Sequence, residues 1–136
     1  MSQVLTDLRD PAYLNKNIAA VRGLYAGLAT GAFDSLGVFL TDDVEFELHD
    51  SSGTLRGHWS GRAAVLAAIR ANFAKVDQQK PELKSMIADG SSVAVLFAET
   101  GVIRATGMPY RASGVQWFTL EDGKVRRVEE IISLTL

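Results

Sequence analysis

Apolar positions near the start of the chain recur with the period of an α-helix. They lie four and three residues apart in alternation, which places them on one helical face: Leu14, Ile18, Val21, Tyr25 and Leu28. Asp10 and Pro11 form a typical helix start, and Gly31 is a typical stop. The pattern therefore predicts an amphipathic helix between Pro11 and Gly31.

Two further helices are predicted downstream. Asp34 is a suitable cap for a short helix over Ser35 to Leu40, and Ser60 for a longer one over Arg62 to Val76. The apolar residues of the longer helix again form one stripe: Val65, Ile69, Phe73 and Val76. The preceding segment, Ser51 to Gly61, is rich in Ser and Gly and is predicted to be a loop.

The period changes to that of β-strands elsewhere. A first strand is predicted at Val44 to Leu48, and four more follow Pro81, at roughly 83–88, 93–104, 110–120 and 125–134. Asp-Gly pairs at 89–90 and 122–123 are hairpin turns, so consecutive strands should form an antiparallel meander. Helices followed by such a meander predict an α+β fold with the helices on one face of the sheet.

The second strand of the meander is apolar on both of its faces. The two sets are Val93, Val95, Phe97 and Ile103 on one side, and Ala94, Leu96, Ala98 and Val102 on the other. Because a strand that is apolar on both faces is usually covered on both, one face should meet the helices. The other face, to which Val115 and Trp117 of the next strand are expected to add, should meet a second copy. The sequence thus predicts a homodimer through the sheet.

Composition and charge narrow the function classes. A chain of 136 residues forms one domain, here with a core at about 12–134, and the absence of cysteine excludes disulfides, thiolate metal sites and a cysteine nucleophile. The net charge of −2 offers no electrostatic footprint for nucleic acid or an anionic membrane. Neither a signal peptide nor a membrane-spanning apolar run is recognisable, so a soluble, cytoplasmic protein is expected.

Three stretches carry a family resemblance. They read LYAGLATGAFDSLGVFLTDDVEFE from Leu24, RGHWSGRAAVLAAIRANF from Arg56, and VIRATGMPYRASGVQWFTLEDGKVRRVEE from Val102. Together they resemble the ketosteroid-isomerase-like, or SnoaL-like, group of the nuclear transport factor 2-like superfamily, over about Asn17 to Leu134. The resemblance implies a cystatin-like cone, in which three N-terminal helices pack in the concave face of a curved, mixed or antiparallel sheet around an internal pocket for a small hydrophobic molecule.

The relatives include isomerases, epoxide hydrolases, polyketide cyclases, dehydratases and binding modules, so fold alone does not select a function. Their best-known catalytic sets are not retained here. The resemblance places the three steroid-isomerase positions on Leu48, Leu24 and Gln116, and the three epoxide-hydrolase positions on Glu99, Gly101 and Glu130. A leucine cannot move a proton, so the steroid-isomerase set is broken. In the epoxide-hydrolase set, which is Asp-Arg-Asp, Glu99 takes the place of the arginine and Gly101 that of one aspartate, so only Glu130 keeps a carboxylate where one is expected. Tyr25, one residue from the isomerase tyrosine position, is expected to face the core.

Three polar residues remain as catalytic candidates. Strand alternation puts Glu99, Gln116 and Glu130 on the same faces as apolar neighbours. If those faces point inward, two carboxylates in a poorly solvated site can divide into an acid and a base, with Gln116 as a donor to a substrate oxygen. The expected walls are Phe46, Leu48, Phe97, Phe118, Val128 and Ile132. The alternative is that both acids pair with Arg104, Arg111, Arg126 or Arg127 and are purely structural.

His49, His58 and Trp59 are expected at the rim of the pocket and complete the predicted ligand-binding surface. Either histidine is able to act as a base at neutral pH. Their spacing with Asp50 matches no recognised ligand pattern, so no metal site is predicted. No nucleotide or flavin signature occurs, so no cofactor is expected. Two functions stay open: an acid-base isomerase, cyclase, dehydratase or hydrolase, or a non-catalytic ligand-binding or dimerisation module.

Overall fold

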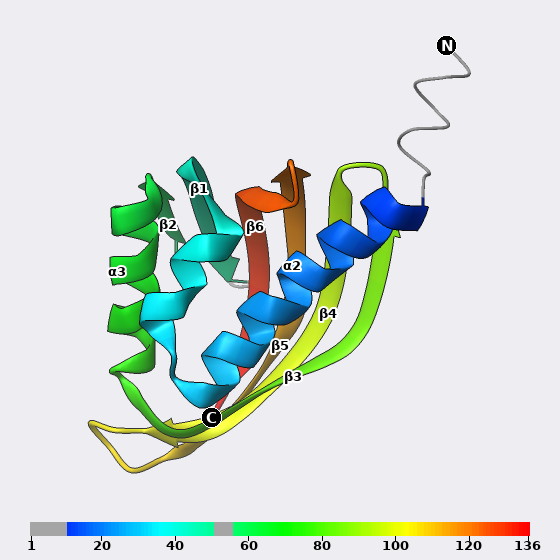
Figure 1. Ribbon diagram of the computed structural model, residues 1–136. Coiled ribbons are helices and arrows are strands. Elements are labelled where there is room, and N and C mark those ends of the chain that lie inside the picture. Colours follow the sequence, from blue (N-terminus) through cyan, green and yellow to red (C-terminus); the bar gives the residue numbers. More distant parts are fainter. Residues whose placement is uncertain (1–10, 51–55) are drawn as a thin grey trace.

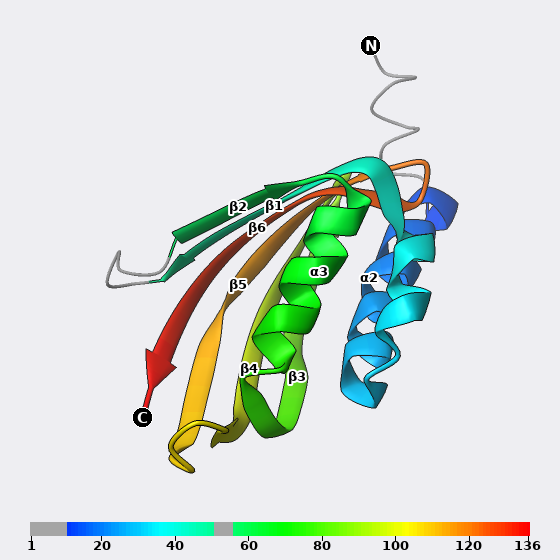
Figure 2. The same ribbon diagram turned by 90° about the vertical axis from the view of Figure 1, so that its left-hand side faces the viewer.

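In the computed structural model, a six-stranded sheet curves around two helices (Figures 1 and 2). The structure describes residues 11–50 and 56–136. In chain order the elements are α2 (Pro11–Thr30), the 3-10 helix η1 (Phe33–Phe39), β1 (Leu40–Asp50), β2 (Arg56–Ser60), α3 (Arg62–Phe73), β3 (Val76–Asp89), β4 (Ser92–Ile103), β5 (Pro109–Glu121) and β6 (Lys124–Thr135). The predicted cap Asp10, the side chain of Leu14 and residues 51–55 lie outside the described residues.

The strands lie in the order β2-β1-β6-β5-β4-β3. The predicted meander is present as β3 to β6, and all of its neighbours are antiparallel. The first strand, β1, adds to the far side of β6 in parallel, and β2 then pairs antiparallel with β1. The sheet is therefore mixed, and its last strand in sequence lies in its interior.

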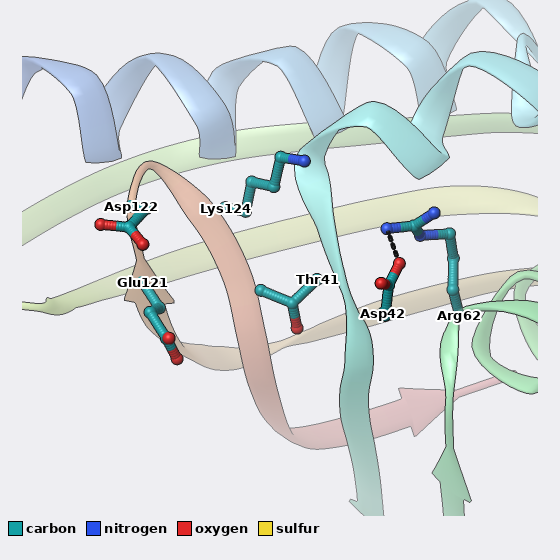
Figure 3. Close-up of a pocket in the computed structure, with 6 residues that line it drawn as sticks. All are labelled: Thr41, Asp42, Arg62, Glu121, Asp122 and Lys124. Carbon is teal, nitrogen blue, oxygen red and sulfur yellow. Dashed lines mark ion pairs between the residues drawn. The ribbon is translucent and has the colours of Figure 1, made fainter.

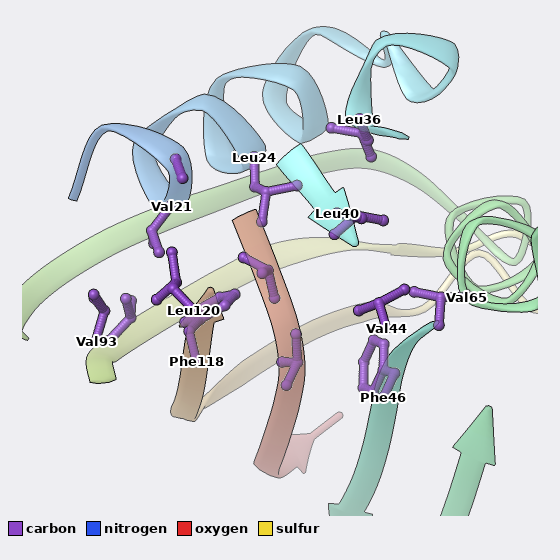
Figure 4. Close-up of a cluster of buried hydrophobic side chains, with 14 of the residues drawn as sticks. Val21, Leu24, Leu36, Leu40, Val44, Phe46, Val65, Val93, Phe118 and Leu120 are labelled. Atoms are coloured by element: carbon purple, nitrogen blue, oxygen red, sulfur yellow. The ribbon is translucent and has the colours of Figure 1, made fainter. Parts of the chain in front are cut away.

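Helices α2 and α3 lie on the concave side of this sheet (Figure 2). The helix α2 ends where Gly31 adopts a φ of 72°, a conformation that costs glycine little. Its stripe supplies Val21 and Leu24 to a core that also contains Leu36 and Leu40 (Figure 4). Burying each such aliphatic side chain stabilises the fold by about 1.5–3 kcal/mol, so the stripe fixes which face of α2 meets the sheet.

Several sequence-based boundaries differ from the structure. The helices are not all N-terminal, because α3 follows β1 and β2. Residues 56–60, predicted as part of a loop, form the edge strand β2, whose glycine and short length conceal any alternation. The residue that caps α3 is Gly61 rather than Ser60, and it makes no side-chain cap bond. The helix ends at Phe73 and not at Val76, where β3 already begins.

Within the part of the chain that the structure describes, no helix is long and apolar enough to cross a membrane.

Candidate functional site

An apolar pocket of about 380 Å³ lies between the helices and the concave face of the sheet. Leu24, Tyr25 and Leu28 of α2 line it from one side, and Val65 and Ile69 of α3 from another. The remaining wall is the sheet itself.

The sheet presents its inward side chains to the pocket as rows that cross the strands. One row consists of Leu48, Glu130, Gln116 and Val95, which are paired in register from β1 to β4. Two residues further along come Ile132, Gly114 and Phe97, and then Leu134, Ala112 and Glu99. Successive rows are about 7 Å apart along the strands. Glu130 and Glu99 therefore stand two rows apart in the same pocket.

The exposure of the lining residues shows which end of the pocket is open. Asn72, Lys75 and Leu134 are exposed and lie at the end that contains Glu99. The opposite end is lined by buried side chains, among them Leu40 and Phe118. Glu130 is thus the deeper of the two acids, and Glu99 is closer to the mouth.

Gln116 links Glu130 to α2 through hydrogen bonds at both ends of its amide. The hydroxyl of Tyr25 donates to Oε1 of Gln116, and Nε2 of Gln116 donates to Oε1 of Glu130 at 2.5 Å. Because Gln116 and Glu130 are direct neighbours across β5 and β6, the sheet register sets their separation. The chain of bonds fixes one carboxyl oxygen of Glu130 and leaves the other, Oε2, without a hydrogen bond to the described residues.

Burial raises the pKa of Glu130 from 4.5 to about 7. The hydrogen bond from Gln116 opposes this shift, and the negative charge of Glu99 adds to it. The pKa of Tyr25 is also raised, by burial first and then by the charges of Glu130 and Glu99, so its hydroxyl stays protonated as a donor. A carboxyl that titrates near neutrality is able both to accept and to donate a proton at physiological pH.

Glu99 is held by a separate contact. The hydroxyl of Tyr110 donates to its Oε2 at 2.7 Å. Burial, this hydrogen bond and the adjacent charge all raise the pKa of Tyr110, which keeps the phenol protonated. Glu99 and Glu130 thus line the same pocket, and the charge of Glu99 acts on Glu130, but each has its own hydrogen-bond partner among the described residues.

The other sequence-based assignments divide into two groups. All six predicted wall residues line the pocket: Phe46, Leu48, Phe97, Phe118, Val128 and Ile132. His49, His58 and Trp59 do not. His49 lies 3.6 Å from Glu47 and His58 lies 3.2 Å from Glu45, both on the outward face of β1 and β2. Trp59 packs edge-on against Phe46, with ring centroids 5.5 Å apart, and so supports a wall residue from behind.

Two tyrosines belong to the site although the sequence did not indicate them as site residues. Tyr25 packs against the core, as expected, and its hydroxyl also reaches Gln116 in the pocket. Tyr110 lines the pocket close to its mouth. Alternation from Gln116 back along β5 places Tyr110 on the same inward face, so that signal was available for this residue. For Tyr25 the helical stripe predicted which face of the helix the side chain occupies. It did not predict how far across the pocket its hydroxyl reaches toward the sheet.

The alternative in which arginines neutralise the two acids is not what the structure contains. Of the four arginines named for that alternative, three pair with other carboxylates, and Arg111 makes no ion pair among residues 11–50 and 56–136. Arg104 contacts Asp77 at 2.8 Å and Arg126 contacts Glu121 at 3.6 Å. Arg127 lies on the outward face, between Glu45, Glu47 and Glu129. Neither Glu99 nor Glu130 has an arginine partner among the described residues.

A second hollow, of about 270 Å³, lies at the turn between β5 and β6 (Figure 3). It is lined by Thr41, Asp42, Arg62, Glu121, Asp122 and Lys124. Arg62 pairs there with Asp42 at 2.5 Å and donates to the carbonyl oxygen of Leu40 at 3.1 Å. These contacts hold the start of α3 against β1. The position of Arg62 in this hollow is therefore explained by a structural role and requires no ligand. No three His, Asp or Glu side chains in the described ranges are grouped as metal ligands.

The fold and pocket define a cone-shaped α+β protein with an internal apolar cavity. Residues 21–128 match the model of the SnoaL-like domain, and the chain belongs to that family. No protein of curated function matches the chain significantly.

Solved structures with the same fold carry several different activities in their names. A proposed isomerase from Bacillus subtilis is 20% identical, with a TM-score of 0.74 over 87% of this chain and 86% of that one. A proposed polyketide cyclase from Xanthomonas campestris is 22% identical, with a TM-score of 0.71 over 87% and 90%. An LEH-like epoxide hydrolase from M. tuberculosis is 18% identical, with a TM-score of 0.72 over 88% and 84%. At these identities the likeness establishes the fold alone.

Proposed function

We propose that this protein is an acid-base catalyst that moves a proton on a small hydrophobic carbonyl compound, with Glu130 as the proton carrier. The observation that carries the proposal is the state of Glu130: a carboxyl with a pKa of about 7, fixed through one oxygen, inside an apolar pocket. Buried acids are usually paired with cations, and Glu130 has no cationic partner among the described residues. Perturbed carboxyls in pockets are typical of catalytic sites.

The chemistry begins with Glu130 as a carboxylate. Its free oxygen, Oε2, takes a proton from the carbon next to the substrate carbonyl, and the electron pair of the broken C–H bond moves onto the carbonyl oxygen as an enolate. Glu130 is then a neutral acid and returns the proton to carbon or oxygen. Isomerisation, cyclisation and dehydration all include such a step. The proposal therefore specifies the proton transfer, and the structure of the substrate determines which product forms.

Gln116 has one N–H left for the developing negative charge. Its amide nitrogen carries two hydrogens, of which one is donated to Glu130. Since Tyr25 holds the amide oxygen, the amide cannot rotate freely, and the second N–H points in a fixed direction. A donor oriented in advance stabilises an oxyanion without reorganisation.

Solvent-deuterium exchange tests this function without knowledge of the natural substrate. The probe is 4-phenylcyclohexanone, an apolar ketone with exchangeable α-hydrogens, incubated in D₂O and followed by mass spectrometry. We expect exchange to increase as pH rises through about 7, where Glu130 loses its proton. Glu130→Gln should reduce exchange at least a hundredfold with little change in ketone affinity. Exchange by this variant at the unsubstituted protein's rate would end the proposal.

A non-catalytic ligand-binding module is the second candidate. It is favoured by the scarcity of free donors: the hydroxyls of Tyr25 and Tyr110 are both donated to protein groups. Binding of 4-phenylcyclohexanone without exchange above the buffer rate, at every pH from 5 to 9, would favour this module over the catalyst.

We also propose that the convex face of the sheet binds a second copy of the chain. Five large apolar side chains are exposed there, on adjacent strands β3 to β6: Ile87, Leu96, Val115, Trp117 and Ile131. Leu96, Val115 and Ile131 are direct cross-strand neighbours, so the patch is continuous. Contiguous apolar patches mark interaction sites. A two-fold axis through the patch would place the apolar side chains of one copy against those of the other. The charged side chains around Arg127 would then lie at the margin of the interface.

A further inference from the structure

Gln79 is a polar residue of the pocket wall for which neither the sequence pattern nor the proposed proton transfer accounts. It lies near the mouth and lines the cavity. Its Oε1 is buried, too enclosed to meet water, and has no hydrogen-bond partner in the described part of the chain. A buried acceptor without a partner costs about 1–3 kcal/mol, so an ordinary structural glutamine would be expected to find one.

The backbone around Gln79 is irregular. The pairing of β3 with β4 passes from Lys80 opposite Thr100 to Asp77 opposite Val102, so that residues 78 and 79 both stand opposite Gly101. Gln78 has a φ of 54°, which a non-glycine residue rarely adopts. Such bulges redirect side chains and are common beside functional sites. Here the bulge turns Asp77 out to Arg104 and leaves Gln79 inward, in phase with Pro81.

Two hydrogen-bond acceptors without a partner lie in the wall at the mouth, whereas the donors of Asn72 and Lys75 lie on exposed side chains at its rim. Glu99 uses Oε2 to accept the hydroxyl of Tyr110, and its Oε1 has no hydrogen bond from the described residues. Oε1 of Gln79 is the second such acceptor. The only phenol at this end, that of Tyr110, already donates to Glu99. A ligand that completes these contacts must bring a hydrogen-bond donor.

We propose that Gln79 is the outer recognition residue of the pocket and binds a hydroxyl group on the trailing end of an elongated, otherwise apolar ligand. Its amide group turns to accept the hydroxyl proton, with Glu99 as a neighbouring acceptor. Gln79 stands three rows of the sheet from Glu130, which corresponds to about 20 Å measured along extended strands. The curvature of the sheet and the length of the two side chains bring their polar groups closer together than that. A ligand that meets both residues is therefore elongated and carries polar groups at both ends. The inference rests on the pocket being the ligand site of the proposed function, but not on turnover.

The test compares three ketones of one shape: 4-phenylcyclohexanone and its derivatives with a 4-hydroxyl or a 4-methoxy group on the phenyl ring. Affinities are measured by calorimetry for the unsubstituted protein, for Gln79→Met, which keeps the length without the amide, and for Gln78→Asn. The last variant is the matched control, because Gln78 is exposed and asparagine tolerates a positive φ.

We expect the hydroxyl compound to bind the unsubstituted protein about five- to tenfold more tightly than the other two. Gln79→Met should remove that preference, and Gln78→Asn should keep it. An equal affinity for all three ketones in the unsubstituted protein would overturn the inference without use of any variant. A hydroxyl preference that survives Gln79→Met would overturn it as well, since the donor would then be bound elsewhere.

The outcome for Gln79 is separable from that for Glu130. Tight, Gln79-dependent binding of the hydroxyl compound without deuterium exchange supports the inference while the catalytic proposal fails. If deuterium exchange is observed but the hydroxyl compound binds no more tightly than the other two ketones, the catalytic proposal is supported and the role of Gln79 is overturned. If none of the three ketones binds, both proposals are wrong, because the pocket does not accept this class of molecule.

Discussion

The ring of Tyr110 on β5 lies directly over Gly101 on β4. The two residues are register partners, and a Cβ on Gly101 would come within 2.6 Å of a ring carbon of Tyr110. In the epoxide-hydrolase residue set that the family resemblance implied, an acidic residue was expected at the Gly101 position. Here the absent side chain leaves the room that the phenol occupies, and the phenol in turn reaches Glu99.

Substituting Gly101 by alanine should therefore displace the Tyr110 ring and weaken its bond to Glu99. We expect a loss of about 1–3 kcal/mol in the free energy of unfolding, measured by urea denaturation. Gly37→Ala is the control, because its nearest new contact would be 3.4 Å away and its backbone is unstrained. Equal effects from the two variants would show that the close approach at Gly101 has no energetic consequence.

Glu130 should make the fold less stable as pH rises. Its pKa is 4.5 in the unfolded chain and about 7 in the folded one, so between these values the unfolded state releases a proton that the folded state retains. Stability is thus lost from pH 4.5 to 7 and is level above that. Glu130→Gln removes the loss, and its advantage should grow from near zero at pH 4 to roughly 3 kcal/mol at pH 8.

Urea unfolding at several pH values measures this difference. Glu129→Gln is the matched control, since Glu129 is the preceding residue and points to solvent on the outward face. A Glu130→Gln variant that is no more stable at pH 8 than at pH 4, relative to the unsubstituted protein, would contradict the raised pKa.

Tyr25→Phe should shift the pH profile of deuterium exchange. Without the phenol, Gln116 loses the donor that fixes its amide oxygen, and its hydrogen bond to Glu130 weakens. Because that bond lowers the pKa of Glu130, the apparent pKa in the profile should rise above 7. Tyr110→Phe, which leaves the Gln116 contacts in place, is the comparison. An unmoved profile for Tyr25→Phe would mean that Gln116 is held by other contacts.

Trp117→Glu should convert a dimer into a monomer. Trp117 is 49% exposed within the convex apolar patch, where a charge would be buried by a second copy. Sedimentation equilibrium gives the mass of each variant. Val38→Glu is the control, since Val38 is 66% exposed but belongs to η1. If the unsubstituted protein is already a monomer at micromolar concentration, the proposed interface is wrong.

The sequence predicted the inward direction of the key acids because alternation is unbroken where they lie. No bulge interrupts the pairing of β4 with β5, and the irregularity between β5 and β6 falls at Thr119, beyond Gln116. The position of Gln79 was not predictable in the same way, because it depends on a bulge in β3 that leaves no clear residue signal. The strand β2 was missed since five residues with a glycine show too little alternation.

The histidines were misplaced for a related reason. His49 ends the first predicted strand and His58 precedes the third predicted helix, which suggested a shared rim, but strand alternation decides the direction of both side chains. His49 is out of phase with Phe46 and Leu48, so it points away from the pocket, and His58 faces Glu45 on the same outer side. Proximity along the chain to wall residues was therefore a poorer guide than alternation.

The parallel pairing of β1 with β6 has a consequence for the order of folding. During synthesis β1 and β2 emerge before the meander, yet their neighbour in the sheet, β6, is the last of the described strands in sequence order. The strands β1 and β2 cannot join the rest of the sheet until β6 is inserted between β1 and β5, and such non-local closures are slow. Glu130 arrives on that strand. The pocket consequently acquires Glu130 in the same event that closes the sheet.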